Sequence, residues 1–398
     1  MLKFDFYSPT RFIFGPGRES EAGSQVKAIG GSRVLVHFGG RSAIASGLLE
    51  RVIESLTQSG LEIFKLGGVQ PNPRDSLVYE GIELCRRENI DTVLAIGGGS
   101  VLDSAKAIAI GTCYEGDFWD LYSAKARPVS RLHLGTIITL PATGSEGSNS
   151  SVIRRDAENL KRGLRSDLNR PDFSIINPEL TYSLPPEQIA AGSSDILTHV
   201  FERYFTRTEE VDLTDRLCEA VMLAVLAAAP ATLTDPTAYG PRANLMWAST
   251  IAHNGFLGVG RQEDWSVHAL EAEIGGLYDT THGDGLAAIL PAWMQYMLPH
   301  QPERAARFAR QVFGVTPSGD LQADGREGIR RLAAFYRTLG LPGNLLAMGV
   351  TREDIPALAA RVKRQPDGSC GFYLPLLDPD ILAIYELAYD WAPDRLDS

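Results

Sequence analysis

Three histidines and one aspartate in the second half of this 398-residue chain have types and spacing that suit a site for one divalent metal ion. Asp195 and His199 lie four residues apart in EQIAAGSSDILTHVFERYF, where apolar residues recur at helical spacing, so both side chains share one helix face. His268 lies on a second predicted helix, and His282 lies in a glycine-bounded turn that opens the next helix. Three imidazoles and a carboxylate suit Zn(II) or Fe(II), and such a site can still admit a substrate oxygen.

A structural role is the ordinary interpretation of each of these residues taken alone. A single histidine such as His199 is more often a satisfied core or surface residue than a ligand, and Asp-x3-His occurs by chance on many helices. The same pair followed by the histidines of DWSVH and TTHGDG favours the metal site.

The first half of the chain carries a glycine-rich turn of the kind that binds phosphate. Gly97, Gly98 and Ser100 follow a predicted strand over 92–96 and open a helix, where backbone N–H groups and the positive helix end can hold a pyrophosphate. Asp103 and Lys106, one turn further, can bond ribose hydroxyls and screen phosphates. The turn matches neither GxGxxG nor the P-loop pattern, so a tight strand-to-helix turn is the alternative.

A second apolar strand, in LGTIITLPATGSEGSNSSVI, runs into a cluster of small hydroxyl residues that can line a nucleotide cleft. The cluster includes Thr143, Ser145 and Asn149. The charged stretch RRDAENLKRG that follows predicts an exposed hairpin. Its Lys161 is a surface lysine unless that hairpin folds over the cofactor.

Strands and amphipathic helices alternate up to FSIINPELTYSLPPEQ, which predicts a parallel sheet covered on both faces. FDFYSPTRFIFGPG predicts two short strands, forming a hairpin or an exposed edge that can pair with a second copy. After Pro185-Pro186 the period changes to 3.6 and helices dominate. We therefore expect an α/β dinucleotide-binding domain of Rossmann-like type over 1–184 and an all-α metal-binding domain over 185–398.

Charge and cysteine content restrict the class of protein. Lys and Arg number 38 against 49 Asp and Glu, and the net charge of −11 argues against nucleic acid or an anionic membrane as the main partner. The four cysteines form no CxxC pair, and the N-terminus has no apolar run of a signal peptide. No window reaches the apolar length of a membrane helix. These features favour the cytoplasm.

Four segments in the same order, GGGSVLDSAKAIA, TLPATGSEGSNSSVI, DILTHVFERY and HALEAEIGGLYDTTHGDGLA, resemble the iron-containing (group III) alcohol dehydrogenases, in particular their butanol dehydrogenase and aldehyde reductase branch. The resemblance covers most of the chain. It implies a dinucleotide-binding domain, a helical metal domain, a cleft between them and a homodimer. The implied enzyme transfers hydride between NAD(P)(H) and a small alcohol or aldehyde, with a Zn or Fe ion polarising the substrate oxygen.

The resemblance also assigns roles to individual residues. The implied metal ligands are Asp195, His199, His268 and His282. The implied pyrophosphate and ribose contacts are Gly97, Gly98, Ser100 and Asp103. Around the nicotinamide half it implies Thr139, Thr143, Asn149 and Lys161, and near the adenosine Asn72.

The sequence departs from the family pattern at two places. Where many relatives have a second histidine four residues after the first late ligand, this chain has Ala272, so a proton must follow another route, through water, a ribose hydroxyl, Tyr278 or Asp279. Where NAD-preferring relatives often place an aspartate after the first strand, this chain has Gly39-Gly40-Arg41-Ser42. No carboxylate there repels a 2′-phosphate, which favours NADP over NAD, although Arg41 can equally face solvent.

Two alternative functions remain open at the level of sequence. A maleylacetate-reductase-like enzyme of the same superfamily would need basic partners for its dicarboxylate, and none lies near the ligand motifs. A noncatalytic nucleotide or metal sensor could keep the glycine turn and the ligands but lose turnover.

Overall fold

The computed structural model describes residues 1–40 and 42–397, which divide into two compact units. The first, here called the sheet unit, contains Tyr7–Leu184 and Pro236–Asn254. The second, here called the helical unit, contains Met1–Phe6, Pro185–Asp235 and Gly255–Ser398. The units are thus discontinuous in sequence, and the predicted functional division between residues 184 and 185 stays a prediction.

A six-stranded parallel sheet forms the centre of the sheet unit, as the alternation of strands and helices predicts. Its strand order is β1-β8-β5-β4-β2-β3. The strands are β1 (Arg11–Phe14), β2 (Arg33–Phe38), β3 (Glu62–Leu66), β4 (Thr92–Gly97), β5 (His133–Ile138) and β8 (Phe173–Ile176). From β2 the chain first adds β3 on one side and then returns to add β4 on the other. The strand order therefore reverses between β2 and β4, the position where open α/β sheets bind ligands.

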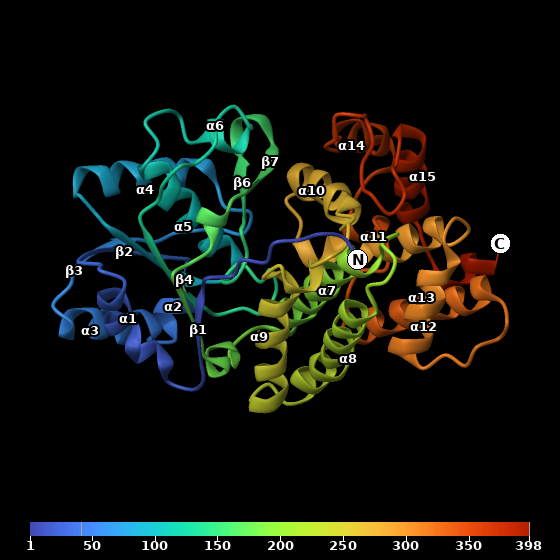
Figure 1. Ribbon diagram of the computed structural model, residues 1–398, viewed down its shortest axis with the longest axis horizontal. Helices are drawn as coiled ribbons and strands as arrows, with labels where there is room; N and C mark the ends of the chain where they lie inside the picture. Colours follow the sequence, from blue (N-terminus) through green and yellow to red (C-terminus); the bar gives the residue numbers. More distant parts are fainter. Residues whose placement is uncertain (41, 398) are drawn as a thin grey trace. The chain divides into compact units, whose positions relative to one another are not determined.

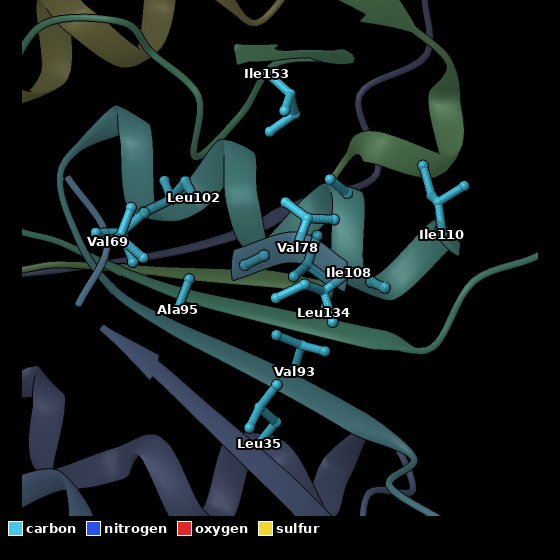
Figure 2. Packing of buried hydrophobic residues seen from close by; sticks show 14 of the residues in the cluster. Leu35, Val69, Val78, Val93, Ala95, Leu102, Ile108, Ile110, Leu134 and Ile153 are labelled. Atoms are coloured by element: carbon cyan, nitrogen blue, oxygen red, sulfur yellow. The ribbon is translucent and has the colours of Figure 1, made fainter. Parts of the chain in front are cut away.

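Alternate residues of the central strands enter two separate cores, one on each face of the sheet. Leu35 of β2, Val93 of β4 and Leu134 of β5 point toward Leu102 and Ile108 on the side shown in Figure 2. The residues between them, among them Val34, Val36, Leu94, Ile96 and Ile137, face the opposite core. A strand buried on both faces must be apolar throughout, which explains its continuous hydrophobic run.

Helices from the intervening segments cover both faces (Figure 1). On the face of Leu35 lie α4 (Asp75–Arg87) and α5 (Gly99–Thr112), and on the other lie α1 (Ala22–Ala28) and α3 (Leu48–Gln58). The sheet unit also contains α2 (Ser42–Ala45), α6 (Trp119–Tyr122) and α9 (Tyr239–His253). This arrangement confirms the Rossmann-like α/β fold class.

The N-terminal segment differs from its prediction. It forms one strand, β1, which pairs in parallel with β8 at the edge of the sheet, so the predicted hairpin is wrong and the edge position is confirmed. An alternation of aromatic and polar residues, as in FDFYSPTRFIF, is expected in a hairpin and in a single edge strand alike. It therefore does not distinguish the two arrangements. The charged hairpin is present, formed by β6 (Ser150–Arg155) and β7 (Leu160–Arg165) in a separate antiparallel pair.

Helices make up most of the helical unit, as the change of period after Pro185 predicts. They are α7 (Pro186–Tyr204), α8 (Asp212–Thr234), α10 (Ser266–Tyr278), α11 (His282–Met297), α12 (Pro302–Phe313), α13 (Leu321–Thr338), α14 (Ile355–Arg361) and α15 (Asp378–Tyr389). Among the described residues, only α8 is long and apolar enough to cross a membrane by length and composition, so the expectation that no window reaches this length is wrong. Core helices also pass this test. Helix α8 packs against α7 and α12.

A buried histidine connects the sheet to the helix that follows the glycine turn. His37 of β2 is fully buried, with Nδ1 2.9 Å from the carbonyl oxygen of Leu66 and Nε2 2.9 Å from Ser104 Oγ in α5. Because a carbonyl only accepts, Nδ1 carries the proton and Nε2 accepts from Ser104. Burial lowers the pKa of His37 to about 4, although the bond to Leu66 opposes the shift.

Acid should therefore destabilise the sheet unit through His37. The folded-state pKa lies below the unfolded value, so the unfolded chain takes up the proton first and stability is lost as the pH falls from about 6.5 toward 4. Between about pH 7 and pH 5 we expect a loss of about 2 kcal/mol that the His37→Asn variant lacks, measured by urea unfolding. Equal losses in both proteins would contradict this role.

Candidate functional site

Helix α7 supplies the first two predicted metal ligands. Asp195 and His199 lie one turn apart on the same face, and His199 Nδ1 is 3.2 Å from Asp195 Oδ1. Every residue of α7 from Ile189 to Tyr204 is buried, and Asp195 is only 2% exposed. A carboxylate this far from water is costly unless positive charge or hydrogen bonds compensate it.

The other two predicted ligands reach the same carboxylate from α10 and α11. His268 Nε2 and His282 Nε2 each lie 3.7 Å from Asp195 Oδ1. Ligand atoms of Asp195, His268 and His282 all lie within 4.8 Å of one another, and the His199 and His268 rings are 4.6 Å apart. The structure thus brings together four side chains that are spread over 88 positions of the sequence, from 195 to 282 inclusive.

The donor atoms fit a divalent cation. Asp195 Oδ1 and His268 Nε2 are buried and have no hydrogen-bond partner among the residues that the structure describes. Buried polar atoms in proteins are almost always partnered, so two such atoms facing one another indicate a bound group. Nitrogen donors together with one carboxylate oxygen suit Zn(II) or Fe(II) better than Mg(II) or Ca(II).

Two buried glutamates that we did not single out from the sequence contact the ligand histidines. Glu202 Oε1 lies 3.1 Å from His268 Nδ1, and Glu271 Oε2 is hydrogen bonded to His282 Nδ1. The available signal was the repeated spacing H-x-x-E, in His199 to Glu202 and in His268 to Glu271. Each glutamate contacts the histidine of another element, so the spacing alone could not reveal the pairing.

Carboxylates dominate the electrostatics around His268. Burial alone lowers the pKa of this imidazole, but the nearby carboxylates of Asp195 and Glu202 outweigh burial and raise the pKa to about 9. The polar surroundings therefore favour positive charge at the point where the four side chains meet. A bound dication supplies that charge and displaces the proton.

The nucleotide-binding candidates of the sheet unit lie at the carboxyl ends of adjacent strands. Gly39 and Gly40 follow β2, Gly97 ends β4, and Thr139 follows β5, with its N–H donating to the Gly97 carbonyl. These ends flank the point between β2 and β4 where the strand order reverses. Arg41 lies outside the described residues, and its neighbour Ser42 is exposed at the start of α2.

Close packing explains the glycines before α5. A Cβ on Gly97 would lie 2.5 Å from Val101 Cγ2, and one on Gly99 would lie 2.4 Å from Thr143 Oγ1. Gly98 is the N-cap, and no described side chain caps the helix, so its first N–H groups can bind a phosphate. Ser100 lies partly exposed in that first turn.

The loop that contains Thr143 rests on α9, which the sequence placed in the other domain. Ser249 Oγ accepts from the N–H groups of Ala142 and Gly144 and donates to the Ala142 carbonyl. His253 Nδ1 lies 2.8 Å from the Thr143 carbonyl oxygen. No local pattern in the sequence indicates this support, since more than 100 residues separate the partners.

Asp103 and Lys106 both contact the 145–152 segment. The Asp103 carboxylate accepts from Ser145 Oγ at 2.7 Å and from the N–H of Val152 at 2.9 Å. Lys106 is fully buried and donates to Ser145 Oγ and to the carbonyl of Ser150 at 2.7 and 2.8 Å. Burial lowers the pKa of Lys106 to about 8, opposed by Asp103. Lys106 therefore holds the loop, and the predicted contact with phosphates stays a prediction.

The remaining predicted contacts are in different environments. Asn72 is 8% exposed, with a positive φ of 54°, in the turn before α4. The Asn149 carbonyl accepts from the side chain of Asn169, and Lys161 lies partly exposed on β7 opposite Arg154. Their roles toward a nucleotide stay predictions.

Tyr278, one of the candidate proton donors, ends α10 with its hydroxyl hydrogen bonded to Asp354. The same oxygen accepts from the N–H of Thr351 at 3.0 Å. Ala272 lies on the same helix and offers no proton. The Tyr278 hydroxyl is thus held by hydrogen bonds to the segment before α14.

Comparison with known families gives matches over nearly the whole chain. The family described as iron-containing alcohol dehydrogenase matches residues 9–178, and the C-terminal region of the Fe-containing alcohol dehydrogenase family matches residues 189–389.

Individual relatives of known name and known structure agree with these matches. NADH-dependent butanol dehydrogenase A of Clostridium acetobutylicum is 37% identical over 98% of this chain and 100% of its own length. The NADPH-dependent aldehyde reductase YqhD of Escherichia coli is 33% identical over 91% of this chain and 93% of its own. The crystal structure of NADH-dependent butanol dehydrogenase A from Thermotoga maritima superposes with a TM-score of 0.95 at 34% identity, covering 98% of this chain and 99% of that one.

Proposed function

Since the chain belongs to the iron-containing alcohol dehydrogenase family and is an NAD(P)-dependent alcohol dehydrogenase or aldehyde reductase, we propose which of its residues bind the divalent metal ion. The proposed ligands are Asp195, His199, His268 and His282. The observation that supports them best is the convergence of His268 Nε2 and His282 Nε2 on one buried oxygen of Asp195, each at 3.7 Å. The metal is Fe(II) or Zn(II), and metal analysis of the purified protein distinguishes the two.

A divalent ion at this position supplies Lewis acidity, which stabilises negative charge on the oxygen of a small alcohol or aldehyde during hydride transfer. The chain contributes orientation and exclusion of water. Asp195 and the imidazoles are held by buried helices, and Trp265 packs beside His199 and His268 with ring centroids 5.9 and 5.2 Å away. Because Ala272 has no titratable group and Tyr278 donates to Asp354, proton exchange runs through water, the ribose of the nucleotide or Asp279.

Removal of one ligand should abolish metal binding and turnover together. In His268→Ala we expect the bound metal to be lost. We also expect kcat/KM to fall ~100-fold to 1,000-fold or more, because ~3 to 4 kcal/mol of transition-state stabilisation is removed. Metal content and the NAD(P)H absorbance change with aldehydes measure the two effects. His300→Ala, which alters an exposed histidine after α11, serves as the control. Full activity of His268→Ala without metal would refute the ligand assignment.

NADP(H) is the proposed preferred cofactor. The turn after β2 reads Gly39-Gly40-Arg41-Ser42 and contains no carboxylate to repel a 2′-phosphate, while Arg41 and Ser42 can bind one. Relatives named for NADH and for NADPH both occur among those described above, so the support rests on this turn.

Substitution of Arg41 tests the proposed cofactor preference. In Arg41→Ala we expect KM for NADPH to rise ~10-fold to 100-fold, because one charge-assisted hydrogen bond to the 2′-phosphate contributes ~1.5 to 3 kcal/mol, with KM for NADH nearly unchanged. Steady-state kinetics with both cofactors provide the measurement. Equal kcat/KM for NADH and NADPH in the unaltered protein would rule out the preference.

A homodimer in the cytoplasm, with no nucleic acid or membrane partner, completes the proposal. The position of β1 at the sheet edge supports the dimer. The net charge of −11 argues against nucleic acid or an anionic membrane as a partner, and four cysteines without a CxxC pair favour the cytoplasm. Sedimentation velocity should give a single species of twice the mass of the chain. A monomer at about 10 µM protein would contradict the dimer.

A further inference from the structure

We propose that Glu202 and Glu271 are positioning residues that fix the proton of His268 and of His282 on Nδ1 and thereby set the affinity of the site for its cation. This inference rests on the metal ligands proposed above. All the groups involved belong to the helical unit.

Glu202 joins α7 to the beginning of α10 through three hydrogen bonds. Its Oε1 accepts from the N–H of His268 at 2.9 Å and lies 3.1 Å from His268 Nδ1. Its Oε2 accepts from the N–H of Trp265 at 2.6 Å. The residue is 2% exposed, so these donors replace the water that a carboxylate otherwise binds.

The bond to Trp265 also stabilises an uncommon backbone conformation. Trp265 is the N-cap of α10 with a φ of 69°, in the left-handed region that a bulky residue rarely adopts. Such a conformation persists only where its surroundings enforce it. Glu202 therefore determines where α10 starts and, with it, where His268 stands.

Glu271 holds the remaining ligand from the opposite direction. It lies on α10, three residues after His268, and is fully buried. Its Oε2 is hydrogen bonded to Nδ1 of His282, the first residue of α11. Helix α10 thus supplies both a proposed ligand, His268, and the carboxylate that is hydrogen bonded to His282 on α11.

These two contacts determine which nitrogen of each ring is left for a metal. An ionised carboxylate only accepts, so each Nδ1 must carry the proton and each Nε2 must present its lone pair. Both Nε2 atoms are those that lie 3.7 Å from Asp195 Oδ1. Hydrogen bonding of the distal ring nitrogen also makes the metal-facing nitrogen a better donor.

The repeated spacing H-x-x-E therefore has a structural meaning. In α7 and α10 alike, a glutamate one turn after a ligand histidine is hydrogen bonded to the ligand histidine of another helix, Glu202 to His268 and Glu271 to His282. The result is a chain of contacts from α7 through α10 to α11. It leaves three buried carboxylates around the site, whose charge a dication offsets.

Cobalt and zinc binding to the metal-free full-length protein tests the proposal without use of activity. In Glu271→Met the acceptor is lost, and we expect the dissociation constant for Co(II), from chelator competition, to rise ~100-fold. Glu271→Gln keeps an acceptor oxygen but not the charge, and we expect a rise of ~10-fold. Glu202→Gln should behave as Glu271→Gln, which keeps the test usable if a Glu202→Met variant fails to fold.

A matched control is available on the same helix. Glu273 is 4% exposed and pairs with Arg361 at 3.1 Å. Glu273→Gln should bind Co(II) within about twofold of the unaltered protein, and its visible Co(II) spectrum should be unchanged. A purely structural role for Glu271 would instead lower the melting temperature of Glu271→Gln and Glu273→Gln alike and leave both spectra unchanged.

Histidine ¹⁵N spectra of the zinc-loaded protein read the tautomers directly. We expect protonated Nδ1 in both His268 and His282, and loss of the Nδ1 proton signal of His282 in Glu271→Met. Co(II) affinity within about twofold of the unaltered protein in Glu271→Met would overturn the positioning role but leave the ligands intact. Failure of the unaltered protein to bind Co(II) or Zn(II) more tightly than His268→Ala would overturn the ligand assignment as well.

Discussion

The burial of one carboxylate, that of Asp195, is the constraint around which the helical unit is built. A buried anion is stable only with positive charge or several donors around it, and three imidazoles converge on it from three helices. Each helix must therefore keep its register and axial position. The continuous burial of α7 and the anchoring of α10 by Glu202 fulfil that requirement.

The sheet unit satisfies a different requirement, which is to expose backbone N–H groups at one end of an otherwise buried layer. Parallel strands with both faces covered leave polar backbone accessible only where they end. Gly99 allows the turn after β4 to approach the Thr143 loop, and Lys106 and Ser249 hold that loop from two sides. The flexibility expected of a loop rich in Gly and Ser is thereby reduced, and such preorganisation would lower the entropic cost of the proposed nucleotide binding.

Family membership and local geometry support each other at the proposed metal site. The family supplies the reaction class, hydride transfer between NAD(P)(H) and an alcohol or aldehyde. The geometry adds what the family description does not contain, namely the atoms that converge and the carboxylates that hold them. Ala272 offers no proton, and the hydroxyl of Tyr278, another candidate donor, is hydrogen bonded to Asp354.

The sequence by itself determined the fold class, the switch from strands to helices near Pro185 and the four residues that meet at the candidate metal site. These features depend on local periodicity and on side-chain chemistry, both of which are written directly in the order of residues. Only the tertiary structure decided that the N-terminal segment is an edge strand beside β8, that α9 supports the Thr143 loop, and that Glu202 pairs with His268 and Glu271 with His282. Each of these is a contact between segments far apart in sequence or on different helices. Their pairing depends on how helices and strands pack, which the pattern along any one segment does not specify.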